Sequence, residues 1–170
     1  MADDNAEVPC FIVHAMDRLY FEDLEPGTVF THAGRVITRQ EIVAFAAEFD
    51  PQPMHLDEEA AKKTMLGGLS ASGWHTCAIM MRLIYDGFIA GRNAASMGAP
   101  SVDEVKWLKP VRPGDTLSLR LSILGKSEPK SRPDLGFVQC RCEILNQHGE
   151  VVLESTYPGM FAKRSREAAE

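Results

Sequence analysis

The sequence has 170 residues, 45% of them hydrophobic and 25% charged, which fits one globular domain with a sizeable core and excludes wholesale disorder. The formal net charge is -6, and the basic residues are scattered along the chain rather than gathered into a stripe. Nucleic acid is therefore not expected as a partner, because nucleic-acid binders usually carry a basic patch.

Both ends of the chain are predicted to be short polar tails, at 1–9 and 163–170, on a single domain that spans 1–170 with its core at about 20–162. Residues 1–9 are acidic and lack the positive start and apolar run of a signal peptide. The longest apolar stretch contains Arg82 and Asp86, which makes it a poor membrane span. The four cysteines fit neither a disulfide framework nor the spacing of a zinc site. We therefore expect a cytoplasmic protein with free thiols and no membrane contact.

The first predicted element is a strand at 28–37, which follows the turn Glu25-Pro26-Gly27. A helix is expected to begin after Thr38, because its hydroxyl can cap free backbone N–H groups and Glu41, three residues later, completes a capping box. The apolar residues that follow recur at helical spacing and give this helix one apolar face: Ile42, Phe45, Ala46 and Phe49.

The segment from Asp50 to His55 reads Asp-Pro-Gln-Pro-Met-His. Proline disfavours the helical conformation in the residue before it, so the two prolines predict an extended segment. Five extended residues would hold Asp50 and His55 roughly 16 Å apart, so the segment must bend if the two share a site. A short helix is predicted at 57–63, with acids first and bases last. Its consecutive acids point in different directions, so no metal site is expected there.

A loop of small residues at 67–73 leads into a long helix, predicted at roughly 73–88. This helix is apolar on nearly every side, which predicts that it is buried all round. His75, one turn into the helix, is expected to be a hydrogen-bonded histidine of the core or of an interface. One face is predicted to be lined by Trp74, Cys77, Ala78, Met81, Tyr85 and Phe88.

The last third of the chain carries the alternating pattern of strands, predicted at 102–108, 117–123, 137–145 and 151–161. Asn146-Gln147-His148-Gly149 is typical of a hairpin turn, and Cys140 and Cys142 would share one face of a strand. One long helix with about five strands predicts an α+β fold, in which an antiparallel sheet wraps around the helix.

Two features carry chemistry. If the segment after Asp50 bends, the Asp50 carboxylate and the His55 imidazole could flank one water molecule, which is the arrangement needed to add or remove water by general acid–base catalysis. Ser72-Gly73 begins the long helix, whose N-terminus offers unpaired N–H groups and a partial positive charge. Such a terminus can hold a thioester carbonyl as it gains enolate character.

With these residues the sequence resembles the MaoC-like (R)-specific enoyl-CoA hydratases. That family carries Asp-x-Asn-Pro-x-His on a loop, followed by a helix and by a small-residue loop whose Gly begins the central helix. The matching residues here are Asp50 to His55 and Ser72-Gly73-Trp74-His75-Thr76, with Gln52 in place of the usual Asn. The likeness runs from about Tyr20 to Phe161 and implies a hot-dog fold, an antiparallel sheet wrapped around a long central α-helix.

The resemblance also implies a function, the interconversion of enoyl and (R)-3-hydroxyacyl thioesters. Asp50 and His55 would be the catalytic pair, Asp50 taking a proton from the water and His55 orienting it. A backbone N–H near Gly73 would bind the thioester carbonyl, with Ser72 and Gln52 as further residues of the substrate site. The acyl group would be carried by CoA or by an acyl-carrier protein. No metal or redox cofactor would be needed, and the chain would form at least a homodimer with sites near the subunit interface.

Two alternatives remain open from the sequence. Hot-dog domains include acyl-CoA thioesterases, although the paired Asp50 and His55 argue against that activity. The chain could also be an acyl-binding or partner subunit that kept the fold and lost the chemistry, and Gln52 in place of the usual Asn leaves that alternative open. Fold alone does not decide between them.

Overall fold

The computed structural model describes residues 17–164. The predicted tail 1–9, Cys10 and residues 165–170 lie outside the described residues. The elements in chain order are η1 (Phe21–Asp23), β1 (Val29–Val36), α1 (Arg39–Phe49), α2 (Pro53–Leu56), α3 (Glu58–Lys62), α4 (Gly73–Ile84), η2 (Tyr85–Ile89), β2 (Glu104–Trp107), β3 (Thr116–Ser127), β4 (Leu135–Leu145) and β5 (Val151–Ala162).

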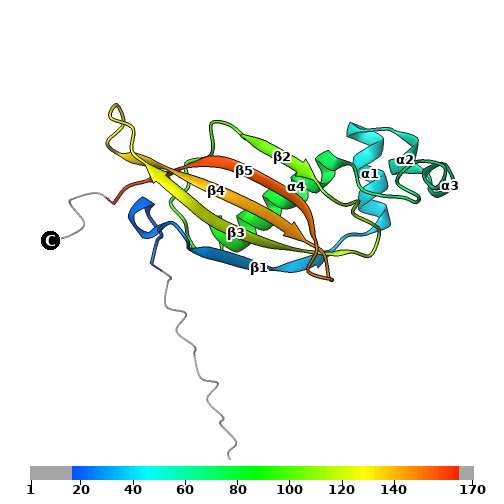
Figure 1. The fold of residues 1–170 in the computed structure, drawn as a ribbon, viewed down its shortest axis with the longest axis horizontal. Coiled ribbons are helices and arrows are strands. Elements are labelled where there is room, and N and C mark those ends of the chain that lie inside the picture. Colours follow the sequence, from blue (N-terminus) through cyan, green and yellow to red (C-terminus); the bar gives the residue numbers. More distant parts are fainter. Residues whose placement is uncertain (1–16, 165–170) are drawn as a thin grey trace, which may run out of the picture.

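The strands form one five-stranded sheet in the order β1-β3-β4-β5-β2, and every neighbouring pair is antiparallel. The sheet curves along α4, and α1, α2 and α3 gather at one end of it (Figure 1). The predicted α+β arrangement, an antiparallel sheet on one long helix, is confirmed. The predicted strands are confirmed with small shifts at their ends, and Gly149 takes the positive φ of 74° that the turn before β5 requires.

The core lies between the sheet and α4. Alternate residues of β3 point inward and are buried, as period-2 patterning predicts. Cys140 and Cys142 share the inward face of β4, which confirms their predicted placement. From α4, residues that include Ile79 and Leu83 belong to the same buried cluster. The cluster fixes α4 against the sheet, and with it the first turn of α4.

Helix α1 begins as predicted. The Thr38 hydroxyl accepts the backbone N–H of Glu41, and the Glu41 carboxylate accepts the backbone N–H of Thr38. Ile42 and Ala46 are buried, and the helix ends at Phe49 with Asp50 as its C-terminal cap residue. The capping box therefore determines where α1 starts, and Asp50 lies directly after the last residue of the helix.

The prediction of extended chain between Asp50 and His55 was wrong in its second half. Gln52 is extended, but Pro53 begins the helical turn α2, which carries His55. Proline disfavours the helical conformation only in the residue before it. Its own fixed φ suits the first position of a helix, where its missing N–H leaves no hydrogen bond unmade. The chain therefore bends at Pro53.

The prediction that the long helix is buried all round was also wrong. The sheet covers one side of α4. On the other side Trp74 and Met81 are 63% and 49% exposed, and Tyr85, the first residue of η2, is 51% exposed. Regular α-helix ends at Ile84 and continues as one π-helical turn, η2. No helix within 17–164 is long and apolar enough to cross a membrane.

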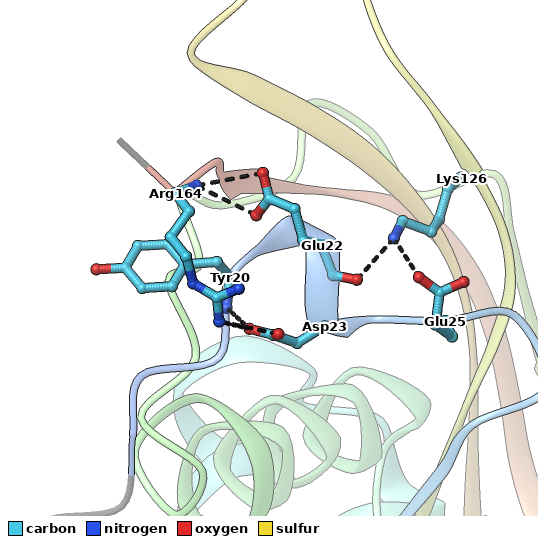
Figure 2. Close-up of polar contacts among 6 residues, drawn as sticks. All are labelled: Tyr20, Glu22, Asp23, Glu25, Lys126 and Arg164. Carbon is cyan, nitrogen blue, oxygen red and sulfur yellow. Dashed lines mark hydrogen bonds and ion pairs between the residues drawn. The ribbon is translucent and has the colours of Figure 1, made fainter. Parts of the chain in front are cut away.

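At the end of the sheet away from α1–α3, a polar network joins the start and the end of the described chain (Figure 2). Arg164 donates to the Asp23 carboxylate, and Lys126 donates to the Glu25 carboxylate and to the backbone carbonyl of Glu22. The Lys126 ammonium also lies 4.4 Å from the centre of the Phe21 ring. These contacts fasten η1 to β3 and to the residues after β5.

Candidate active site

The structure brings Asp50 and His55 together. Asp50 caps the C-terminus of α1, and the turn at α2 folds His55 back so that its Nε2 lies 3.6 Å from Asp50 Oδ2. Both side chains are largely buried, at 17% exposed for Asp50 and 8% for His55. The separation is longer than a direct hydrogen bond, and it allows one water molecule to lie within about 2.8 Å of both atoms.

The orientation of His55 is set by a main-chain atom. His55 Nδ1 lies 2.8 Å from the backbone carbonyl of Ser70, in the loop before α4. A carbonyl oxygen only accepts, so Nδ1 carries the hydrogen and donates it. In the neutral imidazole this leaves a free lone pair on Nε2, the ring nitrogen that lies 3.6 Å from Asp50 Oδ2.

The Asp50 carboxylate is held on both oxygens. Ser72 Oγ donates to Oδ2 at 2.6 Å, and Gln52 Nε2 donates to Oδ1 at 2.8 Å. These two hydrogen bonds, with the Ser72 bond the stronger influence, lower the pKa of Asp50 below its ordinary value of 3.8, and the nearby His55 adds to the effect. Asp50 is therefore a carboxylate at neutral pH.

The three residues expected to bind substrate, Gly73, Ser72 and Gln52, differ in whether they reach the cavity. Gly73 is the first residue of α4, where backbone N–H groups have no partner within the helix. Ser72 is the N-cap residue, fully buried, and its hydroxyl bonds to Asp50. Gln52 lies beside Asp50. The three expected residues therefore lie around the carboxylate and the helix N-terminus, and only Gly73 and Gln52 line the adjoining cavity.

An open cavity of about 560 Å³ adjoins the Asp50–His55 pair. Its polar wall contains Asp50, Gln52, His55 and Ser70, together with Gly73 of α4. Its remaining wall is mostly apolar and includes Leu66, Trp74, Trp107, Leu108 and Val111. A volume in this range, with a few polar groups gathered at one end, is typical of a small-molecule site.

Sequence reasoning missed three residues that build the site. Ser70 supplies the carbonyl that orients His55, Trp107 donates to the Gly73 carbonyl, and Arg112 donates to the carbonyls of Leu66, Gly68 and Leu69 in the loop before α4. Each contact joins positions far apart in sequence. Motif spacing carries no signal for such contacts.

His75 is buried, as expected, but its Nδ1 has no hydrogen-bond partner within the described chain. Its ring instead stacks on Phe45 of α1, with centres 4.7 Å apart and planes 10° apart. Burial lowers the pKa of His75, and the positive charge of Arg35 lowers it further. The expected hydrogen bond is thus absent at Nδ1, and His75 packs α4 against α1 as a neutral ring.

Comparison with known proteins finds a protein family whose model matches this chain. The model of the MaoC like domain matches residues 23–135. The Bacillus subtilis (strain 168) protein YdeM, described as uncharacterized, is 36% identical over 129 residues, 75% of this chain and 88% of its own. A protein of Methylorubrum extorquens AM1 named 3-hydroxybutyryl-CoA dehydratase is 28% identical over 138 residues, 80% of each chain.

The fold has a close structural counterpart. The crystal structure of the MaoC-like dehydratase from Rhodospirillum rubrum matches with a TM-score of 0.80 and 44% sequence identity, covering 86% of this chain and 99% of that one. This match confirms the hot-dog fold that the sequence resemblance implied.

Proposed function

The chain belongs to the MaoC-like domain family, and on that premise we propose that it is a hydratase/dehydratase that interconverts 2-enoyl and (R)-3-hydroxyacyl thioesters. The observation that carries the proposal is the placement of His55 Nε2 against Asp50 Oδ2 at 3.6 Å, beside the N-terminus of α4. The relative named 3-hydroxybutyryl-CoA dehydratase supports this reaction class.

In the proposed mechanism a water molecule donates one hydrogen to His55 Nε2 and the other to Asp50 Oδ2. The sequence suggested Asp50 as the proton acceptor. The hydrogen bonds from Ser72 and Gln52 make the carboxylate a weaker base, so we assign proton removal to His55 Nε2 and stabilisation of the resulting imidazolium to Asp50. The hydroxyl joins C3, and the proton removed from the water stays on the Asp50–His55 pair. C2 takes up one proton in turn, so the net reaction adds one water molecule to the double bond.

Addition at C3 moves electrons toward the thioester carbonyl oxygen. The N-terminus of α4, beginning at Gly73, offers backbone N–H groups and a partial positive charge at the edge of the cavity. We propose that the Gly73 N–H holds this oxygen as it becomes an enolate, a contribution of about 3–4 kcal/mol per donor in oxyanion holes. The same contact would bind a 3-hydroxyacyl thioester for dehydration.

We propose a CoA-linked substrate. The apolar wall of the cavity suits an acyl chain, and Lys109, whose ammonium pairs with the Glu150 carboxylate, is among the residues that line it. The Methylorubrum relative is named for a CoA thioester, which favours CoA over an acyl-carrier protein.

We further propose that the chain acts as a homodimer or higher homo-oligomer. The exposed apolar side chains of Trp74 and Met81 on α4 and of Tyr85 at the start of η2 support this, because burial of such a face in an assembly is favourable. Light scattering coupled to size-exclusion chromatography tests it, and a monomer across the accessible concentration range would contradict it.

The function is tested with purified protein and crotonyl-CoA, by following loss of the enoyl-thioester absorbance together with free thiol. We expect loss of absorbance without thiol release. Asp50→Asn and His55→Gln should each lower kcat by about 100-fold to 10,000-fold, the range for removal of a general acid–base group. His148→Gln, in the exposed turn before β5, is the matched control and should keep the wild-type rate.

The other outcomes identify the alternatives. Thiol release at the rate of absorbance loss would make the chain a thioesterase. No change with crotonyl-CoA or with longer and branched enoyl-CoAs would favour an acyl-binding or partner subunit.

A further inference from the structure

We propose that Ser72 is a positioning residue for Asp50, whose hydroxyl turns the carboxylate toward His55 and joins it to the N-terminus of α4. This inference rests on the proposed hydratase function. It changes the expectation for Ser72, which the family resemblance placed among residues that bind substrate.

The Ser72 hydroxyl has a single hydrogen, and the geometry assigns it. Ser72 Oγ donates to Asp50 Oδ2 at 2.6 Å and accepts the backbone N–H of Trp74 at 3.2 Å. The hydroxyl therefore lies in a chain of hydrogen bonds that runs from the first turn of α4 to the carboxylate. Since its hydrogen is already committed, the hydroxyl has none to donate to a substrate.

The burial of Ser72 also indicates that its side chain contacts Asp50 and not a substrate. The residue is 0% exposed, and it is not among the residues that line the cavity, although its neighbours Ala71 and Gly73 are. Its backbone carbonyl accepts from the Thr76 hydroxyl at 3.2 Å and from the Thr76 N–H at 3.0 Å. Ser72 is thus fixed from both sides, and it contacts Asp50 rather than the space that a substrate would occupy.

The two oxygens of Asp50 are held differently. Gln52 donates to Oδ1 from an exposed position on the neighbouring loop, whereas Ser72 donates to Oδ2, the oxygen that faces His55 Nε2. Loss of the Ser72 bond would free the carboxylate to rotate and would remove the larger of the two hydrogen-bond effects on its charge. We therefore expect Ser72 to affect the chemical step more than the binding of substrate.

The kinetic test compares Ser72→Ala with Ser72→Thr. Ser72→Ala should lower kcat roughly 10-fold to 100-fold, the effect of losing one hydrogen bond to a charged group, with KM changed much less. Ser72→Thr keeps a hydroxyl and should recover most of the rate. Thr38→Ala is the control for loss of a helix cap, because it removes the cap of α1 without touching Asp50, and it should keep the wild-type kcat.

The second measurement does not depend on turnover. The side-chain carboxyl carbon of Asp50 is followed by NMR through an acid titration, its signal assigned by its absence in Asp50→Asn. We expect its midpoint to rise in Ser72→Ala and to return toward the wild-type value in Ser72→Thr. A residue that only stabilises the fold would not move this midpoint.

Each outcome is decisive. A wild-type kcat in Ser72→Ala, or an unchanged Asp50 midpoint, would overturn the inference, as would a rise in KM as large as the fall in kcat. If the wild-type protein hydrates no enoyl thioester, the proposed function fails, and the titration alone still decides whether Ser72 controls Asp50.

Discussion

The indole Nε1–H of Trp107, on β2, donates to the backbone carbonyl of Gly73 at 2.9 Å, and the two residues are 34 positions apart in the sequence. The ring lies so close to Gly73 that an added Cβ would stand 2.7 Å from Trp107 Cε2. Position 73 therefore requires glycine, because the Trp107 ring occupies the space that a side chain would need. Gly73 is also the first residue of α4. The contact fixes the first turn of the helix against the edge of the sheet.

Gly73→Ala is expected to displace the Trp107 ring and break its hydrogen bond. We expect a loss of about 1–3 kcal/mol in the free energy of unfolding, the usual cost of overpacking, and lower hydratase activity because the helix N-terminus moves. Urea denaturation and tryptophan fluorescence measure these changes. Gly125→Ala is the matched control, since an added Cβ there meets nothing within 4 Å, and a similar loss in that variant would contradict the explanation.

Arg112→Lys should loosen the loop before α4. The guanidinium donates to three backbone carbonyls of the loop, including Leu69 at 3.2 Å, and a single ammonium cannot reproduce that planar arrangement. We expect faster hydrogen exchange at 66–71 and a lower kcat, because the Ser70 carbonyl that orients His55 belongs to the same loop. Arg132→Lys, at an exposed ion pair with Asp134, should leave both unchanged, and equal effects in the two variants would refute the prediction.

The stability of the protein should depend on the ionisation of Asp50. Its pKa is lowered in the folded state, chiefly by Ser72, so ionised Asp50 favours folding. The contribution is complete above the ordinary pKa of 3.8 and is lost as pH falls through the lower folded-state pKa. The stability difference between wild type and Asp50→Asn should therefore shrink in acid. Urea denaturation at a series of pH values measures it, and a difference that stays constant with pH would disprove the linkage.

The cysteines of β4 should be unreactive in the folded protein. Burial raises the pKa of the Cys140 thiol to about 11 and raises that of Cys142 as well. In a Cys10→Ser variant we expect a thiol reagent to modify neither residue until denaturant is added, with the modified positions identified by peptide mass spectrometry. Rapid modification under native conditions would show that β4 opens from the core.

Local patterns accounted for the parts of the fold that depend on neighbouring residues. Thr38 and Glu41 predict the start of α1 because a capping box lies within one turn, and the leucines of β3 predict its inward face because alternation is a property of one strand. Asp50 and His55 could be proposed as a pair because the motif that contains them is short, and their catalytic role stays a prediction. The sequence required a bend between them only if the two share a site, and the form of the bend, the helical turn at Pro53, was not predicted.

The remainder of the site depends on contacts across the fold. Arg112 and Trp107 reach the loop and α4 from segments 34 to 46 positions away, and no spacing rule relates them. The exposure of Trp74 and Tyr85 was missed for a similar reason, because hydrophobicity describes a side chain and not which side of α4 the sheet covers.

The Ser70 carbonyl that orients His55 has a consequence for how this site can vary in evolution. A main-chain oxygen is present whatever residue occupies position 70, so this contact does not select for a particular side chain there. The contact instead requires that the backbone keep its path, so that the carbonyl stays beside the imidazole. Ser70 is 1% exposed, so we expect related sequences to carry different small side chains at this position while keeping the number of residues between His55 and Gly73, since one insertion or deletion would move the carbonyl away from the imidazole.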